Sequence, residues 1–586
     1  MVAGARTFGL DETFIEPQVL SPPPTRHALL AFLIALAAVL HIGTAAWGDL
    51  HSRPDALHAE RAREMLQNHQ PLLPTINGLP RPDQPPLLHW LLIASFKIFG
   101  VNTMAARLPA AVAMIASVAV TFLIGERLAD YCRGFAAGLL HLCSSGAFLL
   151  GRVVMPEPVF SAFVAGAILC AVAGYQRRRL RRIWFSGFWV CCALGCLTKG
   201  PAGVLYPVAV CALLAVFFRE ARLRFRSLLY WPYLVLFGLI VAPWSVWIER
   251  HFPGALRELI MPDSANADGR LSHVEFLTMQ LAWCFPASFL ILPGLLFAAR
   301  KIIRPREIEF ADALPLCWIA AVFLPLSAVV HRYDYSAMSA WGALALFAAV
   351  AWERMPRRFW IAGILIVAII GAAIGAIAYG MPGIVSDAAV DWREPGMRTT
   401  AWRALQSIPG SAWLAFRPML IASAFSLALL SILALFLALR GRLYIALTVL
   451  LVGTIPLGLS EIEGVARVTP FFSLADAARF VSPMLGETGE VFFEGPLEEG
   501  ASLLFYGKRP LFLVNQSPDR SAKIEAANTP YVNEGTVLSR WSETDPRYLV
   551  IEQSRVAHWR ELVTERVHIY HQVATCGTYV VLSNQL

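Results

Sequence analysis

Acidic and basic side chains stand at the ends of long apolar runs in this sequence. Asp55 follows the first run, and Glu157 lies in a Pro-Glu-Pro sequence at the start of another. A carboxylate can remove the proton of an acceptor hydroxyl, and Lys or Arg can hold a phosphate that becomes a leaving group. Basic residues suited to that second role are Lys199, Arg107 and Arg152. The mixture suits transfer of a group from a lipid phosphate, although a proton-coupled transporter uses similar residue types.

Each acid also has a purely structural interpretation. Asp55 directly precedes a helical pattern, where a carboxylate can cap the helix or favour its positive end. Glu157 is followed by Pro158, which suits the first turn of a helix, so Glu157 can act as a cap in the same way. The local sequence leaves both interpretations open for both residues.

The composition shows which solvent surrounds these residues. Of the 586 residues, 57% are hydrophobic and 15% are charged. The apolar residues gather in runs of about twenty, the length that spans the hydrocarbon core of a bilayer. Backbone polar groups inside a bilayer must be satisfied internally, so these runs are predicted to be helices.

Thirteen apolar runs predict thirteen membrane-spanning helices. A shorter run at 86–99 contains His89 and Lys97 and is predicted to be an interfacial or re-entrant piece. The thirteen runs lie near residues 28–47, 104–125, 134–151, 158–175, 183–198, 201–218, 229–247, 282–299, 312–330, 336–352, 359–380, 418–439 and 442–459.

Basic clusters predict the orientation of the chain. Five of them follow even-numbered runs, at residues 177–182, 219–226, 300–306, 353–358 and 440–442. Cytoplasmic loops carry an excess of Lys and Arg, so all five fit a cytoplasmic amino terminus. Residues 1–27 are then a cytoplasmic tail, 28–460 the membrane domain, 48–103 its first outer loop, and 461–586 an outer domain.

Charge and cysteine content exclude two other classes. The net charge of +8 comes from short clusters beside apolar runs, not from a basic stripe of the kind that binds nucleic acid. The cluster of Cys191, Cys192 and Cys196 lies inside a run without an accompanying His or carboxylate. It therefore predicts packing cysteines, not a metal site.

Two outer segments have recognisable patterns. Residues 56–66 place alanines and Met65 at helical spacing against charged residues, which predicts an amphipathic helix along the interface. The region 461–586 contains short apolar runs at 490–493, 503–506, 548–551 and 579–582, with helical pieces at 474–484 and 555–564. We predict a small α/β domain there. It lacks the glycine-rich turn of a dinucleotide site.

Eight segments, in this order and spacing, resemble the dolichyl-phosphate-mannose and aminoarabinose transferase family of GT-C-fold membrane glycosyltransferases. The resemblance covers residues 30–350. The segments are Asp55, AERAREML (59–66), NGLPRPDQPPLLHWL (77–91), SFKIFG (95–100), AARLPAA (105–111), MPEPVFSAF (155–163), LTKGP (197–201) and APWSVW (242–247). Thirteen spans followed by an outer domain also resemble the bacterial aminoarabinose branch of the family.

The resemblance implies roles for individual residues. Asp55 matches the acid that activates the acceptor hydroxyl, and Glu157 matches a second-loop acid that steadies the acceptor or a cation. Lys199 matches a phosphate-holding lysine, with Arg107 as a further donor-phosphate ligand. His331 and Arg332 stand where the family has another phosphate-binding lysine. A family lysine is missing where this chain has Gln84.

The resulting hypothesis is a glycosyltransferase of a bacterial inner membrane, with its outer domain in the periplasm. It would move an aminoarabinose- or hexose-type sugar from a polyprenyl-phosphate donor to a lipid A-like lipid, a glycan or a protein. No nucleotide is needed and no definite cofactor is predicted, although Asp83 and His273 are candidate ligands for a divalent metal ion. The alternatives are a flippase for a lipid-linked substrate and a non-catalytic envelope assembly protein.

Overall fold

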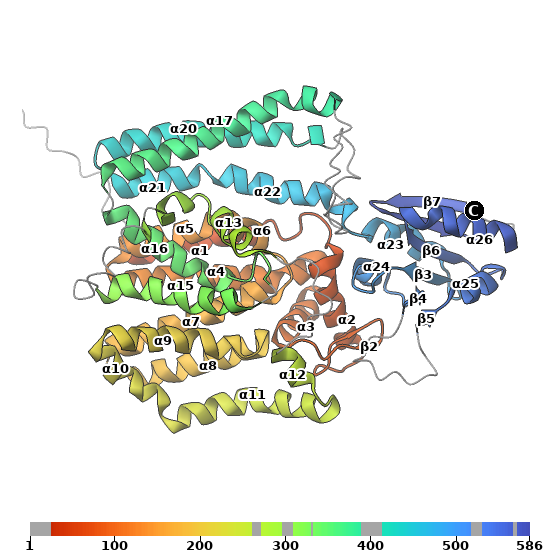
Figure 1. The fold of residues 1–586 in the computed structure, drawn as a ribbon, viewed down its shortest axis with the longest axis horizontal. Coiled ribbons are helices and arrows are strands. Elements are labelled where there is room, and N and C mark those ends of the chain that lie inside the picture. Colours follow the sequence, from red (N-terminus) through yellow and green to blue (C-terminus); the bar gives the residue numbers. More distant parts are fainter. Residues whose placement is uncertain are drawn as a thin grey trace, which may run out of the picture.

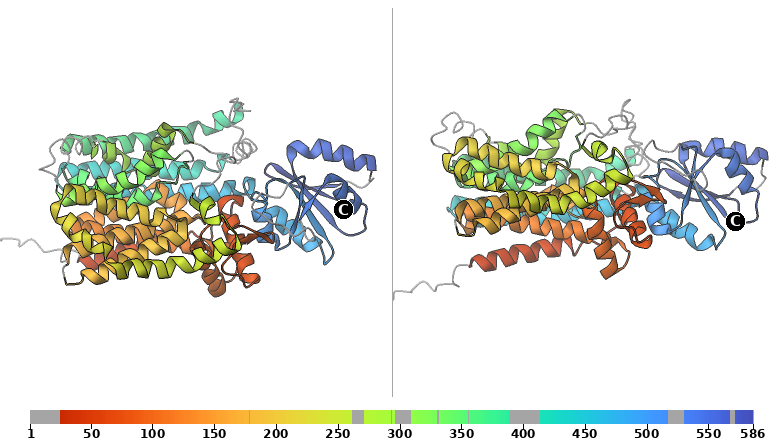
Figure 2. Two further views of the ribbon diagram at one scale, coloured as in Figure 1. Left: turned by 60° about the horizontal axis from the view of Figure 1, so that its bottom comes forward. Right: turned by 90° about the horizontal axis from the view of Figure 1, so that it is seen from below.

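The computed structural model describes residues 25–177, 179–260, 271–292, 294–295, 309–329, 332–354, 356–387, 413–516, 530–566 and 571–585. Long helices run side by side as a bundle, and a smaller domain with a β-sheet stands at one end of it (Figure 1). Two further views show the same arrangement (Figure 2). The predicted fold class, a helical membrane protein with a small carboxyl-terminal α/β domain, is confirmed.

The helices of the bundle follow the predicted spans closely. The predicted run at 134–151 is divided between α5 and α6, and the run at 442–459 between α21 and α22. The bundle and its connections comprise α1 (Arg26–His41), α4 (Thr103–Leu128), α5 (Tyr131–Leu142), α6 (Ser145–Leu150), α7 (Pro156–Gln176), α8 (Arg181–Lys199), α9 (Ala202–Phe217), α10 (Arg219–Phe225), α11 (Trp231–His251), α12 (Ala255–Ile260), α13 (His273–Trp283), α15 (Phe310–Ala328), α16 (Trp341–Arg354), α17 (Arg357–Asp387), α20 (Arg417–Leu439), α21 (Leu443–Val452) and α22 (Ile455–Val468).

Among the described residues, seven helical stretches are long and apolar enough to cross a membrane. Three shorter apolar helices include α1 and α9, which coincide with other predicted spans. Part of the predicted run at 282–299 lies outside the described residues. The seven stretches are Thr103–Leu128, Pro156–Gln176, Trp231–His251, Phe310–Ala328, Arg358–Pro382, Arg417–Leu439 and Leu443–Phe471.

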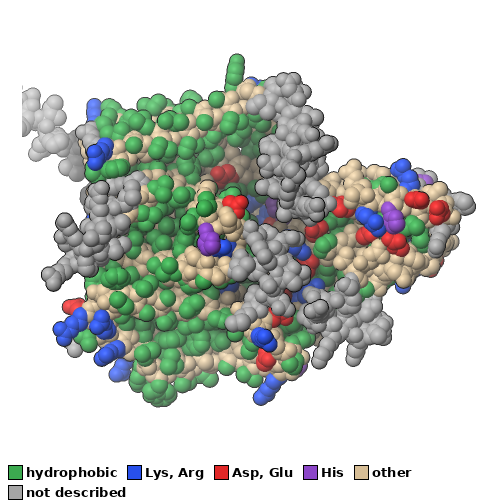
Figure 3. Space-filling model, in the orientation of Figure 1, with side chains coloured by type: hydrophobic (Ala, Val, Ile, Leu, Met, Phe, Trp, Pro, Cys, Tyr) green, Lys and Arg blue, Asp and Glu red, His purple; other side chains and the backbone are tan. Residues whose placement is uncertain are grey.

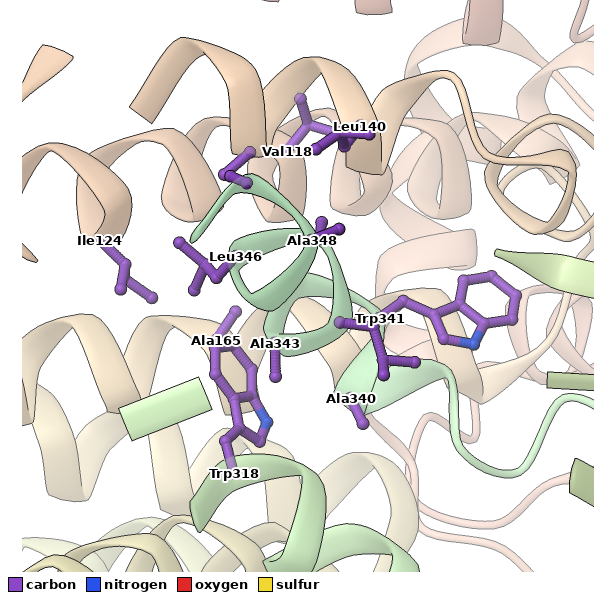
Figure 4. Packing of buried hydrophobic residues seen from close by; sticks show 14 of the residues in the cluster. Val118, Ile124, Leu140, Ala165, Trp318, Ala340, Trp341, Ala343, Leu346 and Ala348 are labelled. Atoms are coloured by element: carbon purple, nitrogen blue, oxygen red, sulfur yellow. The ribbon is translucent and has the colours of Figure 1, made fainter. Parts of the chain in front are cut away.

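Close packing between small and large side chains holds the bundle together. A Cβ atom on Gly125 of α4 would lie 2.9 Å from the Cα atom of Gly134 of α5, so only glycine permits this approach. Trp318 and Trp341 are buried around the alanines of α16 (Figure 4). Lipid tails are as apolar as these side chains, so tight packing is what favours association of the helices.

Hydrophobic side chains cover most of the bundle on the face shown in Figure 3, and Lys and Arg side chains stand at its left end. The basic helix α10 and the basic turn between α20 and α21 both lie at the end opposite to the β-sheet domain (Figure 1). Their common placement agrees with the prediction that the basic clusters lie on the same side of the membrane. The side of the membrane that each end faces stays a prediction.

The first outer loop lies between the bundle and the β-sheet domain (Figure 1). Its predicted helix is α2, which begins two residues after Asp55. The loop contains the five-residue turn η1 (Ser52–Ala56), α2 (Leu57–Gln67), the paired strands β1 (Thr75–Ile76) and β2 (Leu79–Pro80), and α3 (Leu87–Phe99), which coincides with the predicted short piece at 86–99.

The carboxyl-terminal domain is built on one six-stranded sheet of order β5-β4-β3-β6-β8-β7. Strands β3 to β6 are parallel, and β8 and β7 join them antiparallel. The elements are α23 (Ala475–Val481), β3 (Glu490–Glu494), α24 (Ala501–Gly507), β4 (Leu511–Val514), β5 (Tyr531–Val532), α25 (Glu534–Trp541), β6 (Arg547–Glu552), α26 (Val556–Arg566), β7 (His571–Cys576) and β8 (Tyr579–Ser583).

Helices cover both faces of this sheet. Phe492 packs with α25 and α26 on one face, whereas Val491 and Phe493 pack with α23 and α24 on the other. Burial on both faces explains the continuous apolar run of β3. The strand predicted at 503–506 is wrong, because these residues belong to α24. A run of four apolar residues has no periodicity that separates a helix from a strand.

Candidate functional site

Asp55 is held rigidly in the turn η1 and does not cap α2. Its side chain is 3% exposed. Oδ1 accepts a hydrogen bond of 2.6 Å from the Val154 main-chain N–H, and Oδ2 accepts one of 3.2 Å from Arg107 Nη2. No side chain caps the first turn of α2. The structure therefore favours a positioned carboxylate over the helix-cap interpretation.

Arg107 donates most of its hydrogen bonds to the segment that precedes Asp55. Its two terminal nitrogens donate to four main-chain carbonyls, those of Ala45, Trp47, Gly48 and Asp49, in addition to Asp55. Arg152 donates to the carbonyl of Trp47 at 3.1 Å as well. Two buried arginines thus satisfy the carbonyls of one tight turn, and Arg107 also neutralises the acid that follows it.

Glu157 forms the second acidic centre. It lies in the first turn of α7, and its Oε1 accepts a hydrogen bond of 2.9 Å from Lys199 Nζ at the end of α8. The Lys199 ammonium also lies 5.7 Å from the centre of the Phe160 ring. The side chain of Lys199 is 33% exposed, compared with 9% for Glu157. The cation is thus the more open member of this pair.

The two acidic centres lie close together in the fold. Val154, which donates to Asp55, precedes Glu157 by only three residues. The chain at the beginning of α7 thus contacts Asp55 through Val154 and, three residues later, carries Glu157 with its partner Lys199. That the two acids and the lysine act as one site stays a prediction.

A buried loop after α15 completes the surroundings of Glu157. Burial raises the pKa of the Asp334 carboxyl above its ordinary value, and the negative charge of Glu157 raises it further. Arg332 is 7% exposed, and its Nη1 lies 3.4 Å from the Ser327 carbonyl oxygen. Its Nε has no hydrogen-bond partner among the described residues. His331, predicted beside it, lies outside the described residues.

The two predicted metal ligands have separate partners. Asp83 accepts hydrogen bonds of 3.2 and 3.1 Å from Arg61, and His273 Nε2 lies 3.1 Å from the Ser327 carbonyl oxygen. No group of three His, Cys, Asp or Glu side chains that could hold a metal ion occurs in the described part of the chain. The structure therefore gives no support to a metal at Asp83 and His273.

Helix α2 departs from the interfacial helix that its pattern predicts. Its charged side chains are buried instead of facing water, among them Glu60, Arg61 and Glu64. Glu64 accepts hydrogen bonds from Thr75 at 2.8 Å and from the main-chain N–H of Asn77 at 2.6 Å. The strands β1 and β2 cover this face of the helix, and nothing in the pattern of 56–66 signals that cover.

Two buried histidines of the first outer loop were not anticipated as site residues. The rings of His58 and His89 lie 5.6 Å apart. His58 Nδ1 and both ring nitrogens of His89 have no hydrogen-bond partner among the described residues. Buried polar groups are normally paired, so these ring nitrogens, between α2 and α3, are an exception. Their spacing of 31 residues gives no signal in the sequence.

Comparisons with known proteins agree with the motifs. Residues 83–247 match the family described as Dolichyl-phosphate-mannose-protein mannosyltransferase. An uncharacterized protein of Aquifex aeolicus is 25% identical over 303 residues, which cover 50% of this chain and 58% of that protein. An undecaprenyl phosphate-alpha-4-amino-4-deoxy-L-arabinose arabinosyl transferase of Edwardsiella ictaluri is 25% identical over 338 residues, covering 55% and 59%. The chain thus matches somewhat over half the length of these relatives.

Among solved structures, the chain resembles ArnT from Cupriavidus metallidurans in its complex with undecaprenyl phosphate. The TM-score is 0.79 at 20% sequence identity, and the match covers 95% of this chain and 98% of that one. At this identity the likeness shows the fold, which extends over both the bundle and the carboxyl-terminal domain. The predicted family resemblance and the predicted fold are both confirmed.

Proposed function

We propose that this chain, a membrane protein of the mannosyltransferase and aminoarabinose transferase type, transfers a sugar from a polyprenyl-phosphate donor. Its apolar helices and bacterial relatives indicate a multi-pass protein of a bacterial inner membrane. One observation carries the proposal. Asp55 accepts a hydrogen bond from the Val154 main-chain N–H, three residues before Glu157, and Glu157 accepts one from Lys199.

The proposed reaction is an inverting displacement. Asp55 takes the proton of an acceptor hydroxyl, whose oxygen then forms a bond to the anomeric carbon of the donor sugar. The bond from that carbon to the phosphate oxygen breaks, and the polyprenyl phosphate departs with the electron pair. Lys199 and Arg332 hold the charge on the departing phosphate. No nucleotide takes part, because the carrier is already charged with its sugar.

The contacts assign different tasks to the remaining residues. Arg107 donates to Asp55 and to the carbonyls before it, so we assign it to orienting the base instead of binding phosphate. Glu157 accepts a hydrogen bond from Lys199, and we assign it to steadying the acceptor. His331 stays a proposed second ligand of the phosphate, next to Arg332.

The proposed sugar is of the aminoarabinose or hexose type, and the proposed acceptor is a lipid A-like lipid, a glycan or a protein. Support for the sugar and for the polyprenyl-phosphate donor comes from the relatives whose names specify transfer of aminoarabinose and undecaprenyl phosphate. Mass spectrometry of envelope glycolipids from cells with and without the protein identifies both partners. A sugar-sized mass difference on one glycolipid is expected.

A purified-protein assay tests the reaction itself. The protein is incubated with a labelled polyprenyl-phosphate sugar and envelope lipids, and release of free polyprenyl phosphate is measured. Asp55→Asn is expected to lower the rate about 10²- to 10⁴-fold, the usual contribution of a general base. The matched control is Asp545→Asn in the carboxyl-terminal domain, which is expected to keep full activity.

Two outcomes would contradict the proposal. Full activity of Asp55→Asn would remove the base assignment. Movement of the labelled lipid between leaflets without cleavage would instead favour the flippase alternative, since a transporter leaves the bond from sugar to phosphate intact.

A further inference from the structure

The segment that leads into Asp55 is held by residues far along the chain. The main-chain N–H of Leu50 donates to the Tyr506 hydroxyl at 2.8 Å. The N–H of Ser52 donates to the Phe472 carbonyl at 3.1 Å, and the Ser52 and Ser502 hydroxyls lie 2.8 Å apart. Of these three partners, Ser502 and Tyr506 belong to α24, and Phe472 lies three residues before α23. The carboxyl-terminal domain thus contacts the chain immediately before the proposed base.

Ionic and polar side chains reinforce the same contact. Arg479 of α23 pairs with Asp49, with one N–O distance of 2.8 Å. Arg53 donates to Glu498 at 2.8 Å. His51 lies 2.9 Å from the Thr469 hydroxyl, and burial lowers the pKa of His51, so that its ring is neutral near pH 7. Residues before and within the turn are therefore held by contacts from outside it.

Tyr506 links this turn to the helix that carries Arg107. Its hydroxyl also lies 3.0 Å from the hydroxyl of Thr103, at the start of α4 and one helical turn before Arg107. The guanidinium of Arg479 lies 5.0 Å from the centre of the Tyr506 ring. One side chain of α24 thus contacts both the segment before Asp55 and the helix whose arginine holds Asp55.

An apolar core continues across the contact. Leu50 and Ala56 of the first outer loop belong to the same buried cluster as Leu504 and Phe505 of α24. The Phe505 ring lies 6.3 Å from that of Phe96 in α3. The carboxyl-terminal domain is therefore held on the first outer loop by a shared apolar core as well as by surface charges.

We propose that the carboxyl-terminal domain positions the general base, with Ser502 and Tyr506 as the positioning residues. This inference rests on the proposed function. The turn η1 has five residues and few apolar side chains of its own, so its conformation must be imposed by its neighbours. Catalysis is sensitive to such placement, since a shift of about 1 Å in a reacting group can lower a rate 100-fold.

Conservative substitutions test the proposal in the full-length protein. Ser502→Ala and Tyr506→Phe each remove one hydroxyl and keep the surrounding packing. We expect turnover to fall roughly 10- to 100-fold with the KM for the donor lipid nearly unchanged. The matched control is Ser539→Ala, an exposed serine of α25 in the same domain, which is expected to behave as the unmodified protein.

A reversible cross-link separates positioning from simple loss of stability. The close Ser52 and Ser502 hydroxyls suit replacement by a cysteine pair, Ser52→Cys with Ser502→Cys, in a Cys576→Ser background. The reduced pair is expected to have low turnover, and oxidation is expected to restore it by refixing the turn. A role in stability alone would not give recovery of turnover at a temperature where both forms stay folded.

Three results would overturn the inference. They are full turnover of both Ser502→Ala and Tyr506→Phe, failure of the cysteine pair to form a disulfide, and loss of activity on oxidation, which would mean that the domain must move during turnover. The Asp55→Asn variant separates this inference from the function. If Asp55→Asn is inactive while the hydroxyl variants are fully active, only the positioning role fails.

Discussion

The two acidic centres of the site differ in how firmly each is fixed. Asp55 and Arg107 are each 3% exposed in their side chains, and both oxygens of Asp55 have partners. Lys199, the partner of Glu157, is 33% exposed. A general base must already point correctly before the acceptor arrives, whereas a phosphate ligand must be reachable by a lipid. The difference therefore separates a preorganised centre from an open one.

Removing the buried ion pair of Asp55 and Arg107 is expected to have the largest effect on stability. Arg107→Ala removes the positive partner of the buried Asp55 carboxylate and the donor to several buried carbonyls, which costs about 3–5 kcal/mol. Thermal unfolding in one detergent measures the loss against the unmodified protein. A loss close to zero would show that water reaches this turn, contrary to its burial.

Disrupting the pair of Glu157 and Lys199 is expected to affect binding of the donor more than folding. Lys199→Ala removes the proposed charge-assisted contact to the donor phosphate, so the KM for the donor is expected to rise about tenfold, equivalent to about 1.4 kcal/mol. Lys199→Arg keeps the charge and is expected to recover part of the affinity. Equal loss in both variants would argue that Lys199 only supports Glu157.

The pH dependence of stability tests the burial of α2. Burial raises the pKa of Glu60 from 4.5 to about 7, despite its ion pair with Arg63. The folded protein then binds a proton more tightly than the unfolded chain, so this contribution to stability falls as pH rises from 4.5 to 7. Glu60→Gln is expected to flatten that slope in unfolding measurements between pH 5 and 8. An unchanged slope would assign the dependence to other groups.

An exposed ion pair gives the smallest expected effect and a reference for the others. Arg467 and Glu463 in α22 are 44% and 36% exposed in their side chains. Arg467→Ala is expected to change the free energy of unfolding by less than about 1 kcal/mol, because solvent screens the pair. A loss as large as that of Arg107→Ala would remove the contrast between buried and exposed pairs.

Local patterns were sufficient to predict most of the bundle, whereas the roles of the two acids stay predictions. Apolar runs of membrane length have few alternative structures, so the helices α4, α7 and α20 lie within three residues of their predicted bounds. In the carboxyl-terminal domain, β3, β6 and β8 coincide with predicted strands. The helix α24 was misassigned because its apolar run is too short for its period to be recognised.

The partners of the site residues could not be predicted in the same way. Asp55 is 99 residues from Val154, and Ser52 is 450 residues from Ser502. Such contacts depend on how helices cross and where the outer domain sits, and a single sequence carries no local signal for either. The burial of Glu64 illustrates the same limit, since its partners come from a separate strand pair.

The contact between residues 48–53 and 469–506 also sets an order for biosynthesis. Ribosomes add about 5–20 residues per second, so the partners of the early turn emerge on the order of tens of seconds after it. During that interval the nascent protein already has most of its bundle but lacks the supports of Leu50 and Ser52. Under the proposed positioning role, transfer activity is therefore expected only after residues 469–506 have been translated.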